Sequence, residues 1–213
     1  TVGTLRQDVN LRWLVVVAML FGSALIVMPH YQALARQRLG LSGVHLMVVW
    51  VIAHNAAVAV SSLVVGPLAD RRGNRLTLRV LIFGSAVAPA LAVLLPHLPS
   101  SLAADVFWVV FLPLGITPLV LRVVQNYALE ICEPWHHPRY LSITNLCLVV
   151  PFLLSPLVGW LIDAAGFDFV FLSTLGLLVL SGLATFRLDE PRICGMSCGA
   201  ELCARHSTTT TCP

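Results

Sequence analysis

The chain contains no lysine, and only 11% of its 213 residues are charged. A soluble globular domain carries roughly 25% charged residues, so this chain has too few charged side chains to cover a surface that faces water. Its hydrophobic content is 58% and its mean hydropathy is +0.88. We therefore predict an integral membrane protein whose first partner is the lipid bilayer.

Several catalytic patterns are also missing. Without lysine there is no G-x-x-x-x-G-K-[ST] phosphate-binding loop, which excludes ATP hydrolysis by this chain. There is no H-E-x-x-H pair for a zinc protease. The sequence FGSA occurs at 21–24 and 83–86, but neither copy has the second glycine of a G-x-S-G nucleophile. We expect no enzyme activity, no cofactor and no metal site, and the net charge of +3 is too small to indicate nucleic-acid binding.

The six cysteines do not form a pattern typical of a disulfide framework. Cys132 and Cys147 flank a predicted hairpin, and the other four fall in the last stretch of the chain. Together with His206, those four could in principle bind zinc, but their spacing matches no zinc-finger pattern. We interpret 188–213 as a disordered cytoplasmic tail rich in cysteine and threonine.

Long apolar runs recur six times along the chain. A bilayer core of about 30 Å needs about 20 apolar residues of helix, and runs of this length exclude the strands of a membrane barrel. The predicted spans are Trp13–Leu34, Val44–Ala69, Leu76–Leu95, a run from near Val106 to Ile131, Tyr140–Ile162 and Phe169–Phe186. We therefore predict an all-α, polytopic fold, with six transmembrane helices within 13–187 and a short segment at 1–12 before them.

Arginine is unevenly distributed between the two ends of these spans. The flanks and loops at one end carry nine arginines, four of them within 70–79, whereas the other end carries only Arg36 and Arg38. Because positive side chains are retained on the cytoplasmic side, we predict that both termini and the 70–79 loop are cytoplasmic.

The loop that precedes these arginines has a counterpart later in the chain. GPLADRRG (66–73) and GWLIDAAG (159–166) both read G-x-L-x-D-x-x-G, with every matched position 93 residues apart. The matched residues are Gly66, Leu68, Asp70 and Gly73 in the first copy, and Gly159, Leu161, Asp163 and Gly166 in the second. Three predicted helices separate the copies, which puts them on opposite sides of the membrane. This predicts a 3+3 inverted repeat of the kind found in secondary transporters.

Only the first copy carries arginines. Asp70 lies at a helix end, where it can accept hydrogen bonds from Arg71 or Arg75 or face the N-terminus of a neighbouring helix. Gly66 and Gly73 permit close helix approach and a tight reversal. Such a cluster can act as a conformational latch that pairs in one state and separates in another. The alternative is a tight turn whose arginines only set the topology.

Polar side chains inside the spans are candidates for a substrate pathway, because they are costly in lipid. His54 and Asn55 lie near the middle of the second span, where they could line a cavity or only join helices by hydrogen bonds. Tyr31 and Gln32 follow Pro29 in the first span, where a proline kink and polar groups suit a gate or pathway. For Tyr31 the alternative is the aromatic belt.

A polar stripe marks the fourth span. Its members are Arg122, Gln125, Asn126 and Glu130. Their spacing of i, i+3, i+4 and i+8 places them on one helix face, which must face the bundle or an aqueous entrance. Arg122 could hold an anionic substrate group, pair with Glu130 or extend to the membrane interface. Asn145 in the fifth span is placed to join this network.

GPLADRRGNRLTL (66–78) resembles the loop signature of the major facilitator superfamily, with Asn74 at a position that is usually basic. The stretches DVNLRWLVV (8–16), NYALEICEPWHHPRYLSITN (126–145) and PLVGWLIDAAGFDFVFL (156–172) also resemble the C-terminal half of bacterial members. The resemblance covers about residues 8–192. It implies a bacterial inner membrane location and a pathway for a small-molecule substrate between two six-helix bundles.

The chain departs from that family in having six predicted helices rather than twelve. We therefore expect it to be half of a facilitator-type secondary transporter, which moves a small solute by alternating access together with a second six-helix bundle. The alternative is a truncated or half-size membrane protein without transport activity of its own, either a scaffold or regulator or the inert product of a gene fragment.

Overall fold

The computed structural model describes residues 8–41, 43–132 and 134–189, and every regular element in these ranges is a helix. The α-helices are α2 (Val9–Val27), α3 (His30–Leu39), α4 (Val44–Arg72), α5 (Asn74–Leu94), α6 (Ser100–Val106), α7 (Phe111–Leu114), α8 (Thr117–Glu130), α9 (His137–Val149), α10 (Ser155–Ala165) and α11 (Phe167–Ala184). Short 3₁₀ segments connect or extend them: η1 (Leu95–His97), η2 (Phe107–Val110), η3 (Pro134–His136), η4 (Val150–Leu154) and η5 (Thr185–Arg187).

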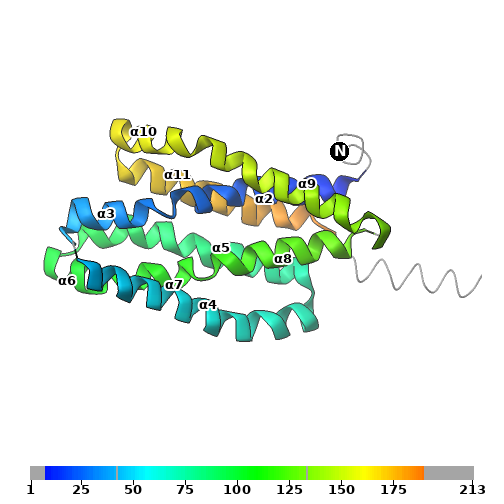
Figure 1. Ribbon diagram of the computed structural model, residues 1–213, viewed down its shortest axis with the longest axis horizontal. Helices are drawn as coiled ribbons and strands as arrows, with labels where there is room; N and C mark the ends of the chain where they lie inside the picture. The colour runs from blue at the N-terminus through cyan, green and yellow to red at the C-terminus, as the bar shows by residue number, and fades with distance from the viewer. Residues whose placement is uncertain (1–7, 42, 133, 190–213) are drawn as a thin grey trace, which may run out of the picture.

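Six of the described helical segments are long and apolar enough to cross a bilayer. They are Val9–Val27, Leu46–Arg72, Asn74–His97, Leu102–Glu130, Pro134–Ala165 and Phe167–Arg187. Figure 1 shows them side by side in one elongated bundle. This confirms the prediction of an all-α membrane protein with six spans. The zinc-ligand candidates of the tail lie outside the described residues.

Three predicted spans are not continuous α-helices. The first divides at Met28–Pro29 into α2 and α3, because proline lacks an N–H group and its ring clashes with the preceding turn. The kink predicted at Pro29 is therefore confirmed as a break. The fourth span begins earlier than predicted and contains η2 and a turn at Gly115, and the fifth contains η4. Prolines at 113, 118, 151 and 156 lie beside these last two interruptions.

The two ends of the bundle differ in charge. One end, here called the arginine end, holds residues 8–12, 70–79, 127–140 and 185–189; the opposite end holds residues 28–41, 95–102 and 163–168. At the arginine end Asp8 starts α2, because its Oδ1 accepts hydrogen bonds from the N–H groups of Asn10 at 2.9 Å and Leu11 at 3.1 Å. Such a cap satisfies N–H groups that have no partner within the helix.

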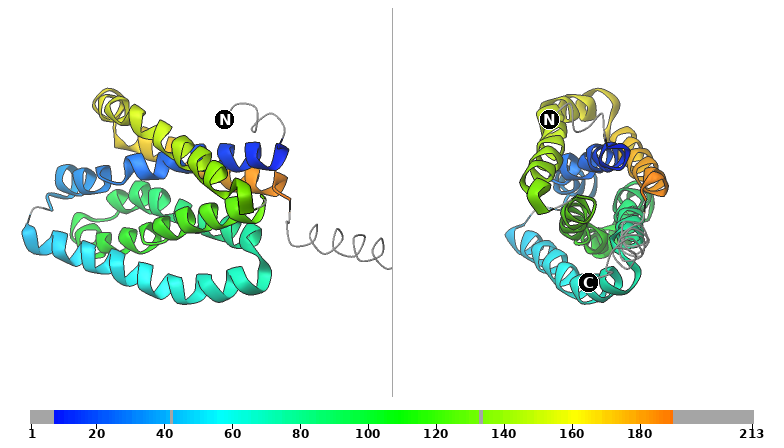
Figure 2. Two further views of the ribbon diagram at one scale, coloured as in Figure 1. Left: turned by 45° about the vertical axis from the view of Figure 1, so that its right-hand side comes forward. Right: turned by 90° about the vertical axis from the view of Figure 1, so that its right-hand side faces the viewer.

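Buried side chains fill the centre of the bundle along its whole length. Towards the opposite end the core is aromatic: the ring of Trp50 stacks on Phe111 with centroids 5.1 Å apart, and Tyr31 packs on Phe171 at 4.7 Å. Seen along the bundle in Figure 2, α5 and α11 lie together on one side, with α4 and α9–α10 at the margins. Only 11% of the α4 window and 17% of the α9–α10 window is buried, against at least 39% elsewhere. These two spans therefore have the most surface free for lipid or a partner.

Candidate functional site

The second glycine of each motif copy forms the same one-residue link between two helices. Gly73 joins α4 to α5 with φ 84° and ψ 159°, and Gly166 joins α10 to α11 with φ 86° and ψ 167°. A backbone of this kind is open almost only to glycine. The N–H of Gly73 donates to Ala69 C=O at 3.0 Å, and that of Gly166 to Ile162 C=O at 2.8 Å. The tight reversal predicted at Gly73 is thus confirmed, and Gly166 forms the same turn in the second copy.

Helix boundaries follow the same 93-residue offset. Adding 93 to the bounds of α4 gives 137 and 165, which are the first residue of α9 and the last of α10. Adding 93 to the first residue of α5 gives 167, the first residue of α11. Figure 1 shows the α4–α5 and α10–α11 links at opposite ends of the bundle. The helix ends around the two glycine links therefore match at this offset, and the two links lie at opposite ends of the bundle.

Close helix contacts also occur in pairs. A Cβ atom at Gly22 would lie 2.6 Å from Cγ of Pro151, and one at Gly115 would lie 3.0 Å from the backbone nitrogen of Val58. Gly22 and Gly115 are 93 residues apart, and so are Val58 and Pro151. Gly22 is in the first span and contacts the fifth, and Gly115 is in the fourth span and contacts the second. The same kind of contact is therefore formed twice. In each case the absence of a side chain lets the helices approach closely.

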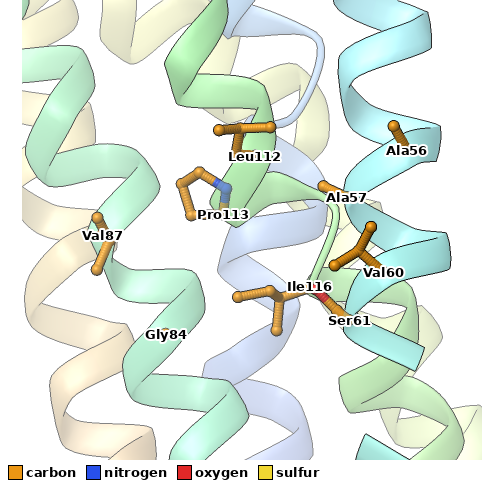
Figure 3. Close-up of a pocket in the computed structure, with 9 residues that line it drawn as sticks. All are labelled: Ala56, Ala57, Val60, Ser61, Gly84, Val87, Leu112, Pro113 and Ile116. Atoms are coloured by element: carbon orange, nitrogen blue, oxygen red, sulfur yellow. The ribbon is translucent and has the colours of Figure 1, made fainter. Parts of the chain in front are cut away.

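Two apolar cavities are related in the same way. One of about 550 Å³ lies between α4, α5 and α7 (Figure 3), and another of about 460 Å³ lies between α2, η4, α10 and α11. Six residues that line the first differ by 93 from residues that line the second: the pairs are Ala57 and Val150, Ser61 and Leu154, Gly84 and Leu177, Leu112 and Met19, Pro113 and Leu20, and Ile116 and Ser23. Neither lining contains a charged residue, so neither cavity suits a polar solute.

The first glycine of each motif copy behaves differently. A Cβ atom at Gly66 or Gly159 would meet nothing within 4 Å. The close helix approach predicted at Gly66 is therefore wrong for the described chain. Leu68 and Leu161 are half-buried beside these glycines, and Asp163 is exposed near the end of α10.

The arginines after the motif contact η5, the 3₁₀ segment that follows α11. The guanidinium of Arg75 donates to the backbone C=O of Phe186 at 3.0 Å, and that of Arg79 donates to Thr185 Oγ1 at 3.2 Å. The guanidinium carbon of Arg79 also lies 3.6 Å from the ring centroid of Phe186, a favourable cation–π geometry. The latch needs a second conformation and stays a prediction.

The predicted pathway residues of the first two spans are not gathered in one cavity. Asn55 is exposed, and its side-chain amide donates to the C=O of Val51 in its own helix at 2.8 Å. His54 is half-buried, and its Nδ1 has no hydrogen-bond partner in the described chain. Gln32 lines a separate cavity of about 330 Å³ at the opposite end. The structure does not bring these side chains together.

The position of Tyr31 differs from both predictions made for it. Its side chain is only 1% exposed and packs on Phe171 within the aromatic core. Both alternatives considered for Tyr31, a pathway lining and the aromatic belt, are therefore wrong. The break at Pro29 explains this, because α3 has a different course from α2 and directs its own buried face inward.

The polar stripe of α8 is exposed along one side of the bundle. Arg122 and Asn126 are exposed, and Gln125 is half-buried. The amide of Gln125 donates to Asn145 Oδ1 on α9 at 3.1 Å. This confirms that Asn145 joins the network predicted from the spacing. Together with Asn145, the stripe forms a group of polar side chains on otherwise apolar spans. This group, here called the polar belt, is the candidate site.

A second polar group, at the arginine end, could not be read from the sequence. The hydroxyl of Tyr127 donates to the backbone C=O of Asp189 at 2.6 Å, and the hydroxyl of Tyr140 donates to Asp8 Oδ2 at 2.8 Å. The backbone N–H of Asp189 in turn donates to Asn10 Oδ1 at 3.0 Å. These contacts hold residues 8–10 and 189 against α8 and α9. The residues that they join are more than sixty positions apart in the sequence.

At the opposite end, Arg38 and Asp168 form an ion pair through two hydrogen bonds of 2.7 Å. The pair links α3 to the first turn of α11. Within residues 8–41, 43–132 and 134–189, no group of three His, Cys, Asp or Glu side chains is placed to hold a metal ion. Neither protein-family models nor curated proteins match this sequence.

Proposed function

We propose that this chain is one half of a secondary transporter of the major facilitator type, in which residues 13–187 form a 3+3 inverted repeat and move a small solute by alternating access. The observation that carries the proposal is the pairing of the two halves at an offset of 93 residues. Matching helix ends around two glycine links at opposite ends of the bundle, nearly identical glycine turns and paired cavities all support it. Inverted-topology repeats of this kind are characteristic of secondary transporters.

The polar belt supports the second part of the proposal. Arg122, Asn126 and Asn145 are exposed on spans that are otherwise apolar. Polar groups at membrane depth face a bundle interior or water rather than lipid. A second six-helix bundle, packed against the sparsely buried α4 and α9–α10, would enclose this belt and leave an aqueous pathway along it.

The orientation belongs to the proposal as well. Because seven of the described arginines lie at the arginine end and two at the opposite end, both termini lie in the cytoplasm of a bacterial cell and the spans cross its inner membrane. Arg72 is exposed at the arginine end, and Gln37 is exposed at the opposite end. In intact cells, a membrane-impermeant maleimide should label Gln37→Cys and leave Arg72→Cys unlabelled until the membrane is permeabilised. The reverse pattern would overturn the orientation.

The pathway is tested at Ser142, an exposed residue on the same face of α9 as Asn145. Ser142→Cys is nearly isosteric and would be introduced into a chain whose native cysteines are replaced by alanine. The proposal expects labelling by a charged maleimide in membrane vesicles, while Leu180→Cys, which is exposed on the apolar surface of α11, stays unlabelled. If neither is labelled, the polar belt is not in water, and the non-transporting membrane protein is the better description.

A further inference from the structure

Arg122 has an unusual position among the charged residues of the described chain. It lies eight residues from the end of the span Leu102–Glu130, or about 12 Å along the helix axis. The described carboxylates all lie near helix ends, and the next deepest arginine, Arg79, lies five residues from the start of its span. Arg122 is therefore the charged group that is placed deepest in the membrane.

Among the described residues, the surroundings of Arg122 contain hydrogen-bond donors and no carboxylate within 4 Å of its guanidinium. α9, which packs beside α8, has no acidic residue along its length. The amides of Gln125 and Asn145 are joined by one hydrogen bond, which leaves the Nδ2 group of Asn145 free to donate. The Asn126 amide on the same helix face is exposed.

Extension of Arg122 to the nearer membrane interface is disfavoured by the direction of α8. The Cα–Cβ bonds of a helix tilt towards its N-terminus, and α8 runs towards the arginine end. The first bonds of the Arg122 side chain therefore point to the membrane interior. The charge must be balanced at that depth.

We propose that Arg122, together with the amides of Gln125, Asn126 and Asn145, binds the anionic group of the transported solute, a carboxylate or a phosphate. This inference rests on the proposed function and names its substrate class. A guanidinium presents two parallel N–H groups that match two oxygens of such an anion. The amides donate to the remaining oxygens, and the absence of a nearby carboxylate disfavours cations. A neutral solute would leave the charge of Arg122 at membrane depth without a counter-ion.

The test uses the Ser142→Cys chain, purified together with its second six-helix bundle and placed in phosphatidylcholine vesicles, with succinate, inorganic phosphate or sorbitol added at constant ionic strength. Bound anion near Arg122 should slow the labelling of the introduced thiol by a charged maleimide, and sorbitol should not. Because charge-assisted hydrogen bonds are lost, Arg122→Gln should raise the anion concentration needed for protection by about tenfold. Arg122→Lys, which keeps the charge but not the paired N–H groups, should have an intermediate effect.

The control is Arg12→Gln, which removes an exposed arginine outside the belt and should leave protection unchanged. Thermal unfolding of each variant in detergent shows whether it is folded, and Arg122→Lys replaces Arg122→Gln if the latter is not. Labelling without protection by either anion would overturn the substrate class while the aqueous pathway stands. Protection that survives Arg122→Gln, or that needs phosphatidylglycerol in the vesicles, would also overturn it. The absence of labelling would instead contradict the proposed function itself.

Discussion

Gly73 and Gly166 have nearly identical backbone conformations at opposite ends of the bundle. Their φ angles differ by 2° and their ψ angles by 8°. Each ends one helix and begins the next without an intervening loop. A turn this short is possible because glycine alone tolerates the angles that reverse the chain within one residue.

The motif glycines should therefore respond in two different ways to alanine. Gly73→Ala and Gly166→Ala should each lower stability by about 1–3 kcal/mol, because alanine is strained at these angles. Gly66→Ala and Gly159→Ala meet no atom within 4 Å and should be neutral or slightly stabilising, since alanine favours helix. Thermal unfolding in detergent measures the stability of all four variants. Equal losses of stability at the first and second glycines of the motif would contradict the assignment of the strained turns to Gly73 and Gly166.

The close crossings at Gly22 and Gly115 should not tolerate a side chain. A Cβ atom at Gly115 would lie 2.7 Å from Ala57 Cβ and 2.7 Å from the C=O of His54, so Gly115→Ala should cost about 1–3 kcal/mol by overpacking. Gly22→Ala should have a similar cost against Pro151. Gly176→Ala, where nothing lies within 4 Å, is the matched control.

A second substitution checks whether the Gly115 effect comes from that crossing. Ala57→Gly should restore part of the stability lost in Gly115→Ala, because it removes one of the two clashing atoms. The double-mutant cycle measures this coupling. Strictly additive losses would show that the clash lies elsewhere.

The ion pair of Arg38 and Asp168 should contribute modestly to stability. The side chains are 34% and 42% exposed, so the pair is worth at most about 1 kcal/mol, and salt should reduce that value. Arg38→Gln and Asp168→Asn, alone and combined, would give the coupling from thermal unfolding at low and high salt. A coupling that does not change with salt would contradict an exposed ion pair.

Cys132 should react slowly with maleimides at neutral pH. Burial and the negative charge of Asp8 raise the pKa of its thiol, and the thiolate is the reactive form. Labelling should therefore increase only as the pH rises through this elevated pKa. Asp8→Asn removes the charge, which lowers the pKa and should shift the labelling profile to lower pH.

This experiment needs a chain whose other five cysteines are replaced by alanine. Tyr140→Phe is the control, because it removes the hydrogen bond to Asp8 and retains the carboxylate. A profile that shifts equally in Tyr140→Phe and Asp8→Asn would show that access, rather than charge, limits the reaction.

The sequence was sufficient for features that depend on neighbouring residues. Apolar runs of about 20 residues have no stable alternative to a spanning helix in lipid, so the number of spans was predictable. The spacing within 122–130 placed the polar stripe on one face of α8 for the same local reason. The prolines at 113, 118, 151 and 156 also signalled breaks in the fourth and fifth spans, although only the break at Pro29 was predicted.

What the sequence by itself determined is an all-helical membrane protein of six spans with two matching turns, because hydropathy, helix length and glycine turns are properties of short segments. Only the tertiary structure decided that Tyr31 is buried in an aromatic core, that Arg38 pairs with Asp168, and that no carboxylate of the described residues lies within 4 Å of Arg122. These depend on which helices lie side by side. Contacts between positions more than a hundred residues apart are selected by the packing of the whole bundle, and no local pattern encodes them.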